Sequence, residues 1–112
     1  MATFVVDRKT WYRGKGSEGS RLLDSSGQRC CLGFVAEQCG IGDEDLLGSP
    51  DIIGVSYPAV VNFPEWLYKD GETADAGFVY EVNDSCSISD EKRERMLKRV
   101  FAQAGDEIQF VG

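Results

Sequence analysis

The segment from Ser89 to Ala104 limits the fold more than any other part of this 112-residue chain. Its apolar residues recur at the spacing of one helical face, and charged residues take the opposite side. Ser89 is a typical N-cap, and acidic residues follow it in the first turn, where they suit the helix dipole. Residues 106–111 then alternate between polar and apolar, the pattern of a half-buried strand. The sequence therefore predicts a long helix and a final strand; the helix's apolar face is Met96, Leu97, Val100, Phe101 and Ala104.

The rest of the chain predicts shorter elements. Residues 3–6 favour a strand, residues 8–11 one helical turn, and residues 21–31 a β-hairpin that turns at 24–27. Helices are expected over residues 31–39, over 43–47 with Asp43 as the cap, from Pro64 onward, and over 74–83. We therefore predict one α+β domain spanning residues 1–112. A small antiparallel sheet, made of the N-terminal strand, the hairpin and the C-terminal strand, would pack against several helices.

Composition narrows the class of protein. Hydrophobic residues make up 42% of the chain and include twelve aromatics, counted as two Trp, four Tyr and six Phe, so a real core is expected. No apolar run approaches the roughly 20 residues that span a bilayer, and charge follows the first apolar residues too soon for a signal peptide. We expect a cytoplasmic protein. The net charge of −7 disfavours direct nucleic-acid binding, although a local basic patch at Arg8, Lys9, Arg13 and Lys15 is left open.

Four cysteines offer four interpretations. A zinc site is disfavoured because Cys30 and Cys31 are adjacent and the chain has no histidine. A disulfide is disfavoured by the reducing compartment. A nucleophile just ahead of the helix at 31–39, with Arg29 beside it, would need a carboxylate as its base. The favoured interpretation is core packing, because cysteine is among the most buried residue types.

No other catalytic or cofactor motif stands out, so neither a cofactor nor a metal is predicted. Without histidine there is no Ser-His-Asp or Cys-His set. The run Gly14 to Ser17 lacks the spacing of a phosphate-binding loop. The acidic run Asp43, Glu44 and Asp45 lacks the alternating oxygen ligands and the glycine of a calcium loop.

A W-x-R-G element at 11–14, a Leu-Leu pair at 22–23 and a C-C-L-G element at 30–33 resemble small uncharacterised proteins of bacteriophages and prophages. The resemblance extends to Asn83-Asp84, the charged helix and the final strand, and it implies a phage context but no activity. The motif residues have structural interpretations. Trp11 would anchor the core, Gly33 would allow close packing of the hairpin on the helix, and Arg13 would need a carboxylate partner.

Taken together, these features favour a non-enzymatic phage accessory protein that binds and modulates a host or phage protein, as anti-defence inhibitors do. Residues 48–63 form a long apolar stretch with no regular period, which suits a binding loop. Two alternatives stay open: a structural or regulatory domain of a larger assembly, and a small cysteine-containing enzyme or ligand-binding domain. The residues predicted to contact a partner are Asp43, Glu44, Asp45, Ile53 and Tyr57.

Overall fold

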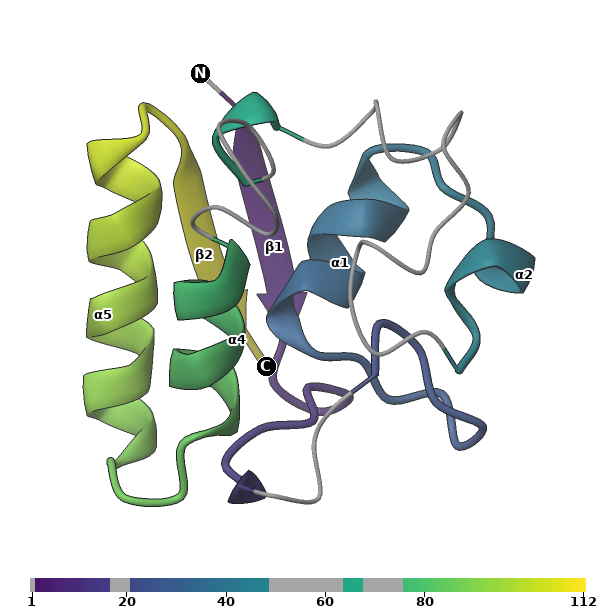
Figure 1. The fold of residues 1–112 in the computed structure, drawn as a ribbon, viewed down its shortest axis with the longest axis horizontal. Coiled ribbons are helices and arrows are strands. Elements are labelled where there is room, and N and C mark those ends of the chain that lie inside the picture. The colour runs from purple at the N-terminus through teal and green to yellow at the C-terminus, as the bar shows by residue number, and fades with distance from the viewer. Residues whose placement is uncertain (1, 17–20, 49–63, 68–75) are drawn as a thin grey trace.

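A computed structural model of the chain describes residues 2–16, 21–48, 64–67 and 76–112. In these ranges a parallel two-stranded sheet lies against a group of helices (Figure 1). The elements, in chain order, are β1 (Thr3–Asp7), α1 (Cys31–Gln38), α2 (Asp43–Leu46), the 3-10 helix η3 (Glu65–Leu67), α4 (Ala76–Asp84), α5 (Asp90–Gln103) and β2 (Glu107–Val111).

The sheet differs from the prediction. β1 and β2 run parallel, with Thr3 opposite Glu107 and Asp7 opposite Val111, so the predicted antiparallel sheet is wrong. The predicted hairpin over 21–31 is also wrong, although its turn exists: Gly27 N–H donates to the Asp24 carbonyl. The two arms are joined by hydrogen bonds from Asp24 N–H to the Gln28 carbonyl and from Cys30 N–H to the Arg21 carbonyl, but they form no β-ladder. Their isolated bridges are to other segments, Arg29 with Trp11 and Leu23 with Leu47. Residues 8–10 form a turn rather than a helix.

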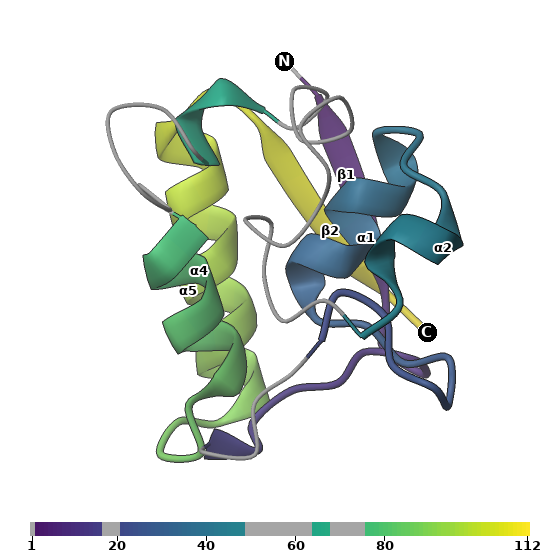
Figure 2. The same ribbon diagram turned by 45° about the vertical axis from the view of Figure 1, so that its right-hand side comes forward.

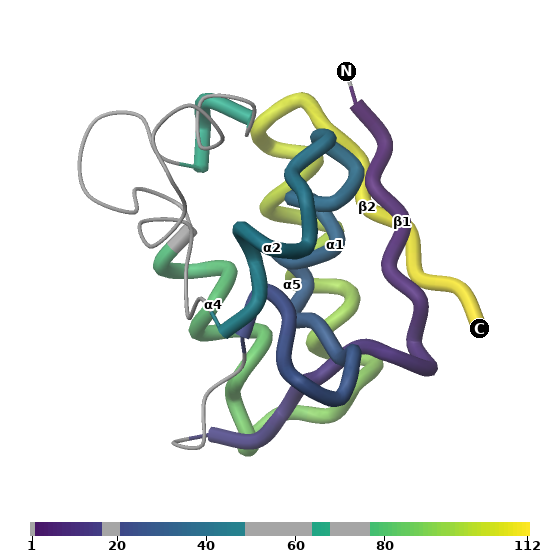
Figure 3. Tube along the Cα trace, turned by 90° about the vertical axis from the view of Figure 1, so that its right-hand side faces the viewer, coloured from purple at the N-terminus to yellow at the C-terminus, as the bar shows by residue number. Residues whose placement is uncertain are grey.

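The helices lie on one side of the sheet (Figures 2 and 3). α1 packs on β1, α5 packs on β2, and α4 contacts both α1 and α5. Alternation along each strand turns one set of side chains toward the helices and leaves the other set exposed or half-exposed. The inward set is Phe4, Val6, Ile108 and Phe110.

Most of the predicted helices are confirmed. The Ser89 hydroxyl accepts a hydrogen bond from Lys92 N–H at 3.2 Å and caps α5 as predicted. Helix rather than strand is confirmed for residues 76–84. The cap of α2 was placed one residue too late, because Gly42 is the N-cap and Asp43 is the first helical residue.

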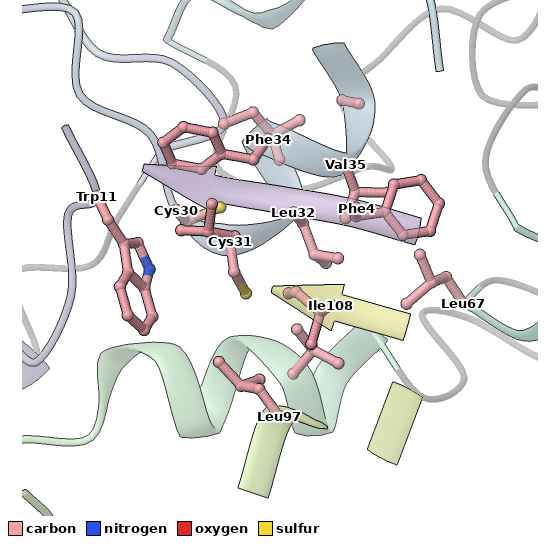
Figure 4. Packing of buried hydrophobic residues seen from close by; sticks show 14 of the residues in the cluster. Phe4, Trp11, Cys30, Cys31, Leu32, Phe34, Val35, Leu67, Leu97 and Ile108 are labelled. Carbon is pink, nitrogen blue, oxygen red and sulfur yellow. The ribbon is translucent and has the colours of Figure 1, made fainter. Parts of the chain in front are cut away.

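The core joins all the layers. Trp11 stacks on Phe110 with ring centroids 4.8 Å apart, and Phe101 meets Trp66 edge-on at 4.9 Å. Gly33 lies so close to the preceding segment that a Cβ there would be 1.9 Å from the Leu22 carbonyl oxygen. The close approach expected at Gly33 is therefore present, although its partner is not a hairpin. Figure 4 shows the packed side chains, among them Phe4, Cys30, Cys31, Leu32, Val35, Leu97 and Ile108.

No helix in the described ranges is both long enough and apolar enough to pass through a bilayer.

Candidate functional site

The motif residues of the sequence meet at one buried side chain, Asn83. Its carbonyl oxygen accepts hydrogen bonds from the Trp11 indole N–H at 2.7 Å and from the Cys31 backbone N–H at 3.0 Å. Its amide nitrogen donates to the Tyr12 carbonyl, and its own backbone carbonyl accepts from Gly14 N–H. We call this group, together with Arg93, the Asn83 hub. It joins the segment after β1, the N-terminus of α1 and the C-terminus of α4.

Arg93 supports the hub from α5. It is only 2% exposed, and its guanidinium donates to the backbone carbonyls of Val82, Asn83, Ser85 and Ile88 at 2.7–3.2 Å. These carbonyls lie at the end of α4 and in the loop that follows, where helical carbonyls lack partners within the helix. Arg93 thus fixes the α4–α5 connection. Gly14 lies against it, because a Cβ at Gly14 would be 3.0 Å from the guanidinium, and the residue has a φ of +71°.

Trp11 and Arg13 have the surroundings that their structural interpretations require. Trp11 is buried, and the Arg13 guanidinium lies 4.5 Å from the centre of its ring. Arg13 also forms the expected ion pair, with its Nε 3.4 Å from the Asp90 carboxylate. Its terminal nitrogen donates to the carbonyls of Arg8 and Trp11. Each residue of the W-x-R-G element therefore makes contacts that stabilise the fold.

The cysteine environments argue against a nucleophile at the start of α1. Cys30 and Cys31 are both fully buried, and all four cysteines are free thiols. Burial raises the pKa of the Cys31 thiol well above its usual value, and the nearby Cys30 and Asp84 raise it further. Arg29 does not compensate, because it pairs with Glu37 at 3.1 Å and with Asp43 at 3.0 Å. Cys31 thus stays a protonated, packed thiol at neutral pH.

Half-burial also raises the pKa of Cys39, whereas Cys86 is exposed. Within the described ranges, no group of three or more cysteine, aspartate or glutamate residues is placed to hold a metal ion.

The predicted partner-binding residues are only partly described. Asp43, Glu44 and Asp45 form the exposed first turn of α2, and Asp43 accepts a hydrogen bond from Arg29. Ile53 and Tyr57 lie outside the described residues. Only the three acidic residues are placed by the structure, and the role of all five in binding stays a prediction.

A polar hollow of about 640 Å³ adjoins the hub and includes the basic patch left open by the sequence. All three of its arginines already have partners: Arg8 forms two hydrogen bonds with the Glu94 carboxylate, at 2.8 and 2.9 Å, and Arg13 pairs with Asp90. Arg93 donates to four carbonyls. Lys9 and Lys15 remain at the rim, so the hollow offers few free donors to a bound anion.

A different surface combines exposed cations with the exposed ring of Phe78. Two hollows, of about 320 and 130 Å³, follow the outer side of α5 and share Met96 and Arg99. Phe78 of α4 borders the second hollow and is 44% exposed. We define the basic–apolar stripe as Phe78, Lys92, Arg95, Met96, Arg99, Val100 and Gln103.

The cations of the stripe have no partners among the described residues. Lys92, Arg95 and Arg99 are exposed, and none of them forms an ion pair there. The sequence placed Arg95 and Arg99 correctly on the polar side of the helix. Met96 and Val100 were predicted on the apolar face of the helix; they are half-buried, pack against the core and also line the stripe. Ala104, predicted on the same face, is exposed. Spacings of three and four residues from 92 through 96 and 99 to 103 were the signal for the stripe.

The chain matches no known protein family, no curated protein and no solved structure.

Proposed function

We propose that this chain is a non-enzymatic accessory protein, of the kind found in bacteriophages, that binds an acidic segment of a host protein and thereby modulates that protein. The observation that carries the proposal is the basic–apolar stripe: exposed cations without partners in the described ranges, next to the exposed ring of Phe78. In the phage context that the resemblance implies, inhibition of a host defence protein is one form that this function would take.

The chemistry of the stripe defines the partner. Arginine and aromatic residues are the types that contribute most to binding energy at protein interfaces. Arg95 and Arg99 can each receive a carboxylate in a bidentate geometry, and Phe78 with Met96 offers an apolar contact in the hollow that Arg99 lines. A partner segment that carries acidic residues around one apolar side chain fits this arrangement.

The charge distribution of the chain favours one surface for the approach of an acidic partner. With a net charge of −7, most of the surface repels an acidic partner, whereas the outer side of α5 attracts it. The remaining chemistry of the chain supports a binding role over catalysis. The Asn83 hub engages the W-x-R-G and C-C-L-G elements in structural contacts, and Cys31 is held protonated.

Charge reversal on the stripe tests the proposal. The double variant Arg95→Glu/Arg99→Glu is compared with Lys9→Glu/Arg21→Glu, which changes the net charge equally at exposed positions away from the stripe. Each protein is immobilised and exposed to bacterial lysate, and captured proteins are then purified and titrated directly. We expect an acidic protein to bind wild type and the control with equal affinity, to bind the stripe variant at least tenfold more weakly, and to lose affinity as salt is raised.

Two outcomes contradict the proposal. In one, the stripe variant retains the same partners at the same affinity, which places binding elsewhere on the chain. In the other, a labelled DNA duplex binds wild type through the stripe while no acidic protein does, which makes the stripe a phosphate-binding surface.

A further inference from the structure

The basic–apolar stripe is divided along its length into a cationic side and an apolar side. The larger of its two hollows contains Lys92 and Arg95 of α5. The smaller one lies between the two helices, which run side by side (Figure 1), and is lined by Phe78 of α4 and Val100 of α5. A segment bound along the stripe therefore meets apolar side chains on the side of α4 and cations on the other side.

The charge of α4 sharpens this division. Glu81 is exposed and follows Phe78 by three residues, so the two side chains share a face of α4. The sequence of α4, AGFVYEVND, contains no lysine or arginine. Acidic groups of a partner are therefore attracted over α5 and repelled over α4. The partner must carry them along one side of its apolar residues.

The cations follow the rise of a helix. Lys92, Arg95 and Arg99 are separated by three and four residues, so they repeat about every 5 Å along the axis of α5. A second α-helix has the same rise, and its residues at spacings of three and four meet these cations in turn. The side chains on one face of a strand repeat about every 6.6 Å and match them less well. The stripe from Lys92 to Gln103 is about 17 Å long, or three turns of helix.

The backbone of α5 offers nothing to a partner strand. In the middle turns of the helix, the N–H and C=O groups already pair with each other. An extended segment pressed onto Met96 and Phe78 would lose water from its own backbone groups and gain no hydrogen bonds in return. A helix arrives with these groups already paired, so it can bury an apolar face here without that cost.

We propose that the partner segment is an amphipathic α-helix that packs along the stripe as a third helix beside α4 and α5. Its apolar row covers Phe78, Met96 and Val100, and acidic residues along one flank of that row lie over the three cations of α5. This inference rests on the proposed function, and it adds the shape and the residue spacing of the partner to its charge.

The two sides of the stripe make different contributions to binding. Burial of the Phe78 ring, which is exposed in the free protein, supplies affinity and slows dissociation. Exposed ion pairs contribute little each, but together they speed association and orient the partner. Replacing Phe78 should therefore act mainly on the dissociation rate, whereas replacing Arg95 and Arg99 should act mainly on the association rate and its dependence on salt.

Three synthetic peptides of identical composition test the inference. Each has about 18 residues, enough for five turns of helix, drawn from Leu, Glu, Gln and Ala. The first has leucines at spacings of three and four with glutamates along one flank of that row. The second keeps the leucines but moves the glutamates to the opposite face of the helix, and the third alternates apolar and polar residues as a strand does. We expect the first to bind at least tenfold more tightly than the others and to gain helical circular dichroism on binding.

A methionine signal locates the bound peptide. The chain has two methionines, at positions 1 and 96, so methyl labelling gives few signals, and Met96→Leu identifies the one from the stripe. That signal should shift as the first peptide is added. Phe78→Gln should weaken binding at least tenfold, whereas Val111→Thr on β2, at a residue with the same 44% exposure, should leave it unchanged.

The outcomes separate this inference from the proposed function. Binding of the strand-patterned peptide as tight as that of the first, equal binding of the first and second peptides, or an unmoved Met96 signal would overturn the helical partner. The same holds if no peptide binds while charge reversal on the stripe still releases an acidic protein captured from lysate, and the proposed function then stands. If charge reversal also leaves capture unchanged, both proposals are wrong.

Discussion

The two sides of α5 carry the same kind of residue in opposite circumstances. On the inner side, Arg93 is buried and donates to four backbone carbonyls. On the outer side, Arg95 and Arg99 are exposed and have no ion pair in the described part of the chain. The comparison shows that the acceptors facing an arginine decide whether it stabilises the fold or stays available for binding.

A variant at Arg93 should give the largest effect on stability. Arg93→Met keeps much of the side-chain volume but leaves buried carbonyls without donors, and we expect a loss of about 3–5 kcal/mol in the free energy of unfolding. Arg95→Met on the outer side should change it by less than about 0.5 kcal/mol. Urea denaturation of both variants measures the difference. Equal, small losses would show that Arg93 is not a support of the fold.

The second-largest loss of stability is expected from a variant at Asn83. Asn83→Ala removes the acceptor shared by Trp11 and the N-terminus of α1, together with the donor to Tyr12, and should cost about 3 kcal/mol. Trp11→Phe removes only the indole N–H and one ring, and a smaller loss of about 1–2 kcal/mol is expected. A similar cost for the two variants, measured by the same denaturation, would mean that the hub depends on packing and not on the Asn83 amide.

Glu94 is an intermediate case, since it is a partly buried partner on α5. Hydrogen bonding to Arg8 holds the pKa of Glu94 below its usual value. The pair therefore stabilises the fold fully at pH values above the unfolded pKa of about 4.3. This stabilisation is lost as pH falls through the lower pKa of the folded state. Glu94→Gln should therefore cost up to about 1 kcal/mol at neutral pH and progressively less as pH falls below about 4. A cost that does not change with pH would rule out the ionic contribution.

The smallest effect is expected on the stripe. Lys92→Gln/Arg99→Gln should leave the free energy of unfolding within about 0.5 kcal/mol of wild type, because no described group pairs with either cation. A clear loss of stability in thermal unfolding would show that these cations support the fold, and it would remove the contrast between the two sides of α5.

Local features of the fold could be predicted from the sequence. Ser89 caps α5 by contact with a residue three positions away, and α1 and α4 follow apolar spacings within one segment. Strand pairing could not be predicted, because alternation over 106–111 shows which face is buried but not which strand lies beside it or in which direction. β1 and β2 come from opposite ends of the described chain, and no turn between them fixes their register.

The candidate site was harder to predict from the sequence, for the same reason. Asn83 lies in the last turn of α4, and the two segments that its side chain joins, at Trp11–Tyr12 and at Cys31, are distant in sequence, so only the fold shows that it is the centre of the hub. The cations of α5 are plain in the sequence, but their lack of partners depends on what packs beside them. Exposure of Phe78 likewise depends on how α4 rests on α5.

The pairing of β1 with β2 also sets a timescale for biosynthesis. Thr3 and Glu107, which face each other in the sheet, are 104 positions apart, and a ribosome adds about 5–20 residues each second. β1 therefore waits roughly 5–20 seconds for its partner strand. Gln38, only 33 positions after Val5, is made much sooner and can occupy one side of the waiting strand. The other side stays open until β2 emerges, and during that interval the nascent chain is most exposed to capture by a chaperone or by another nascent chain.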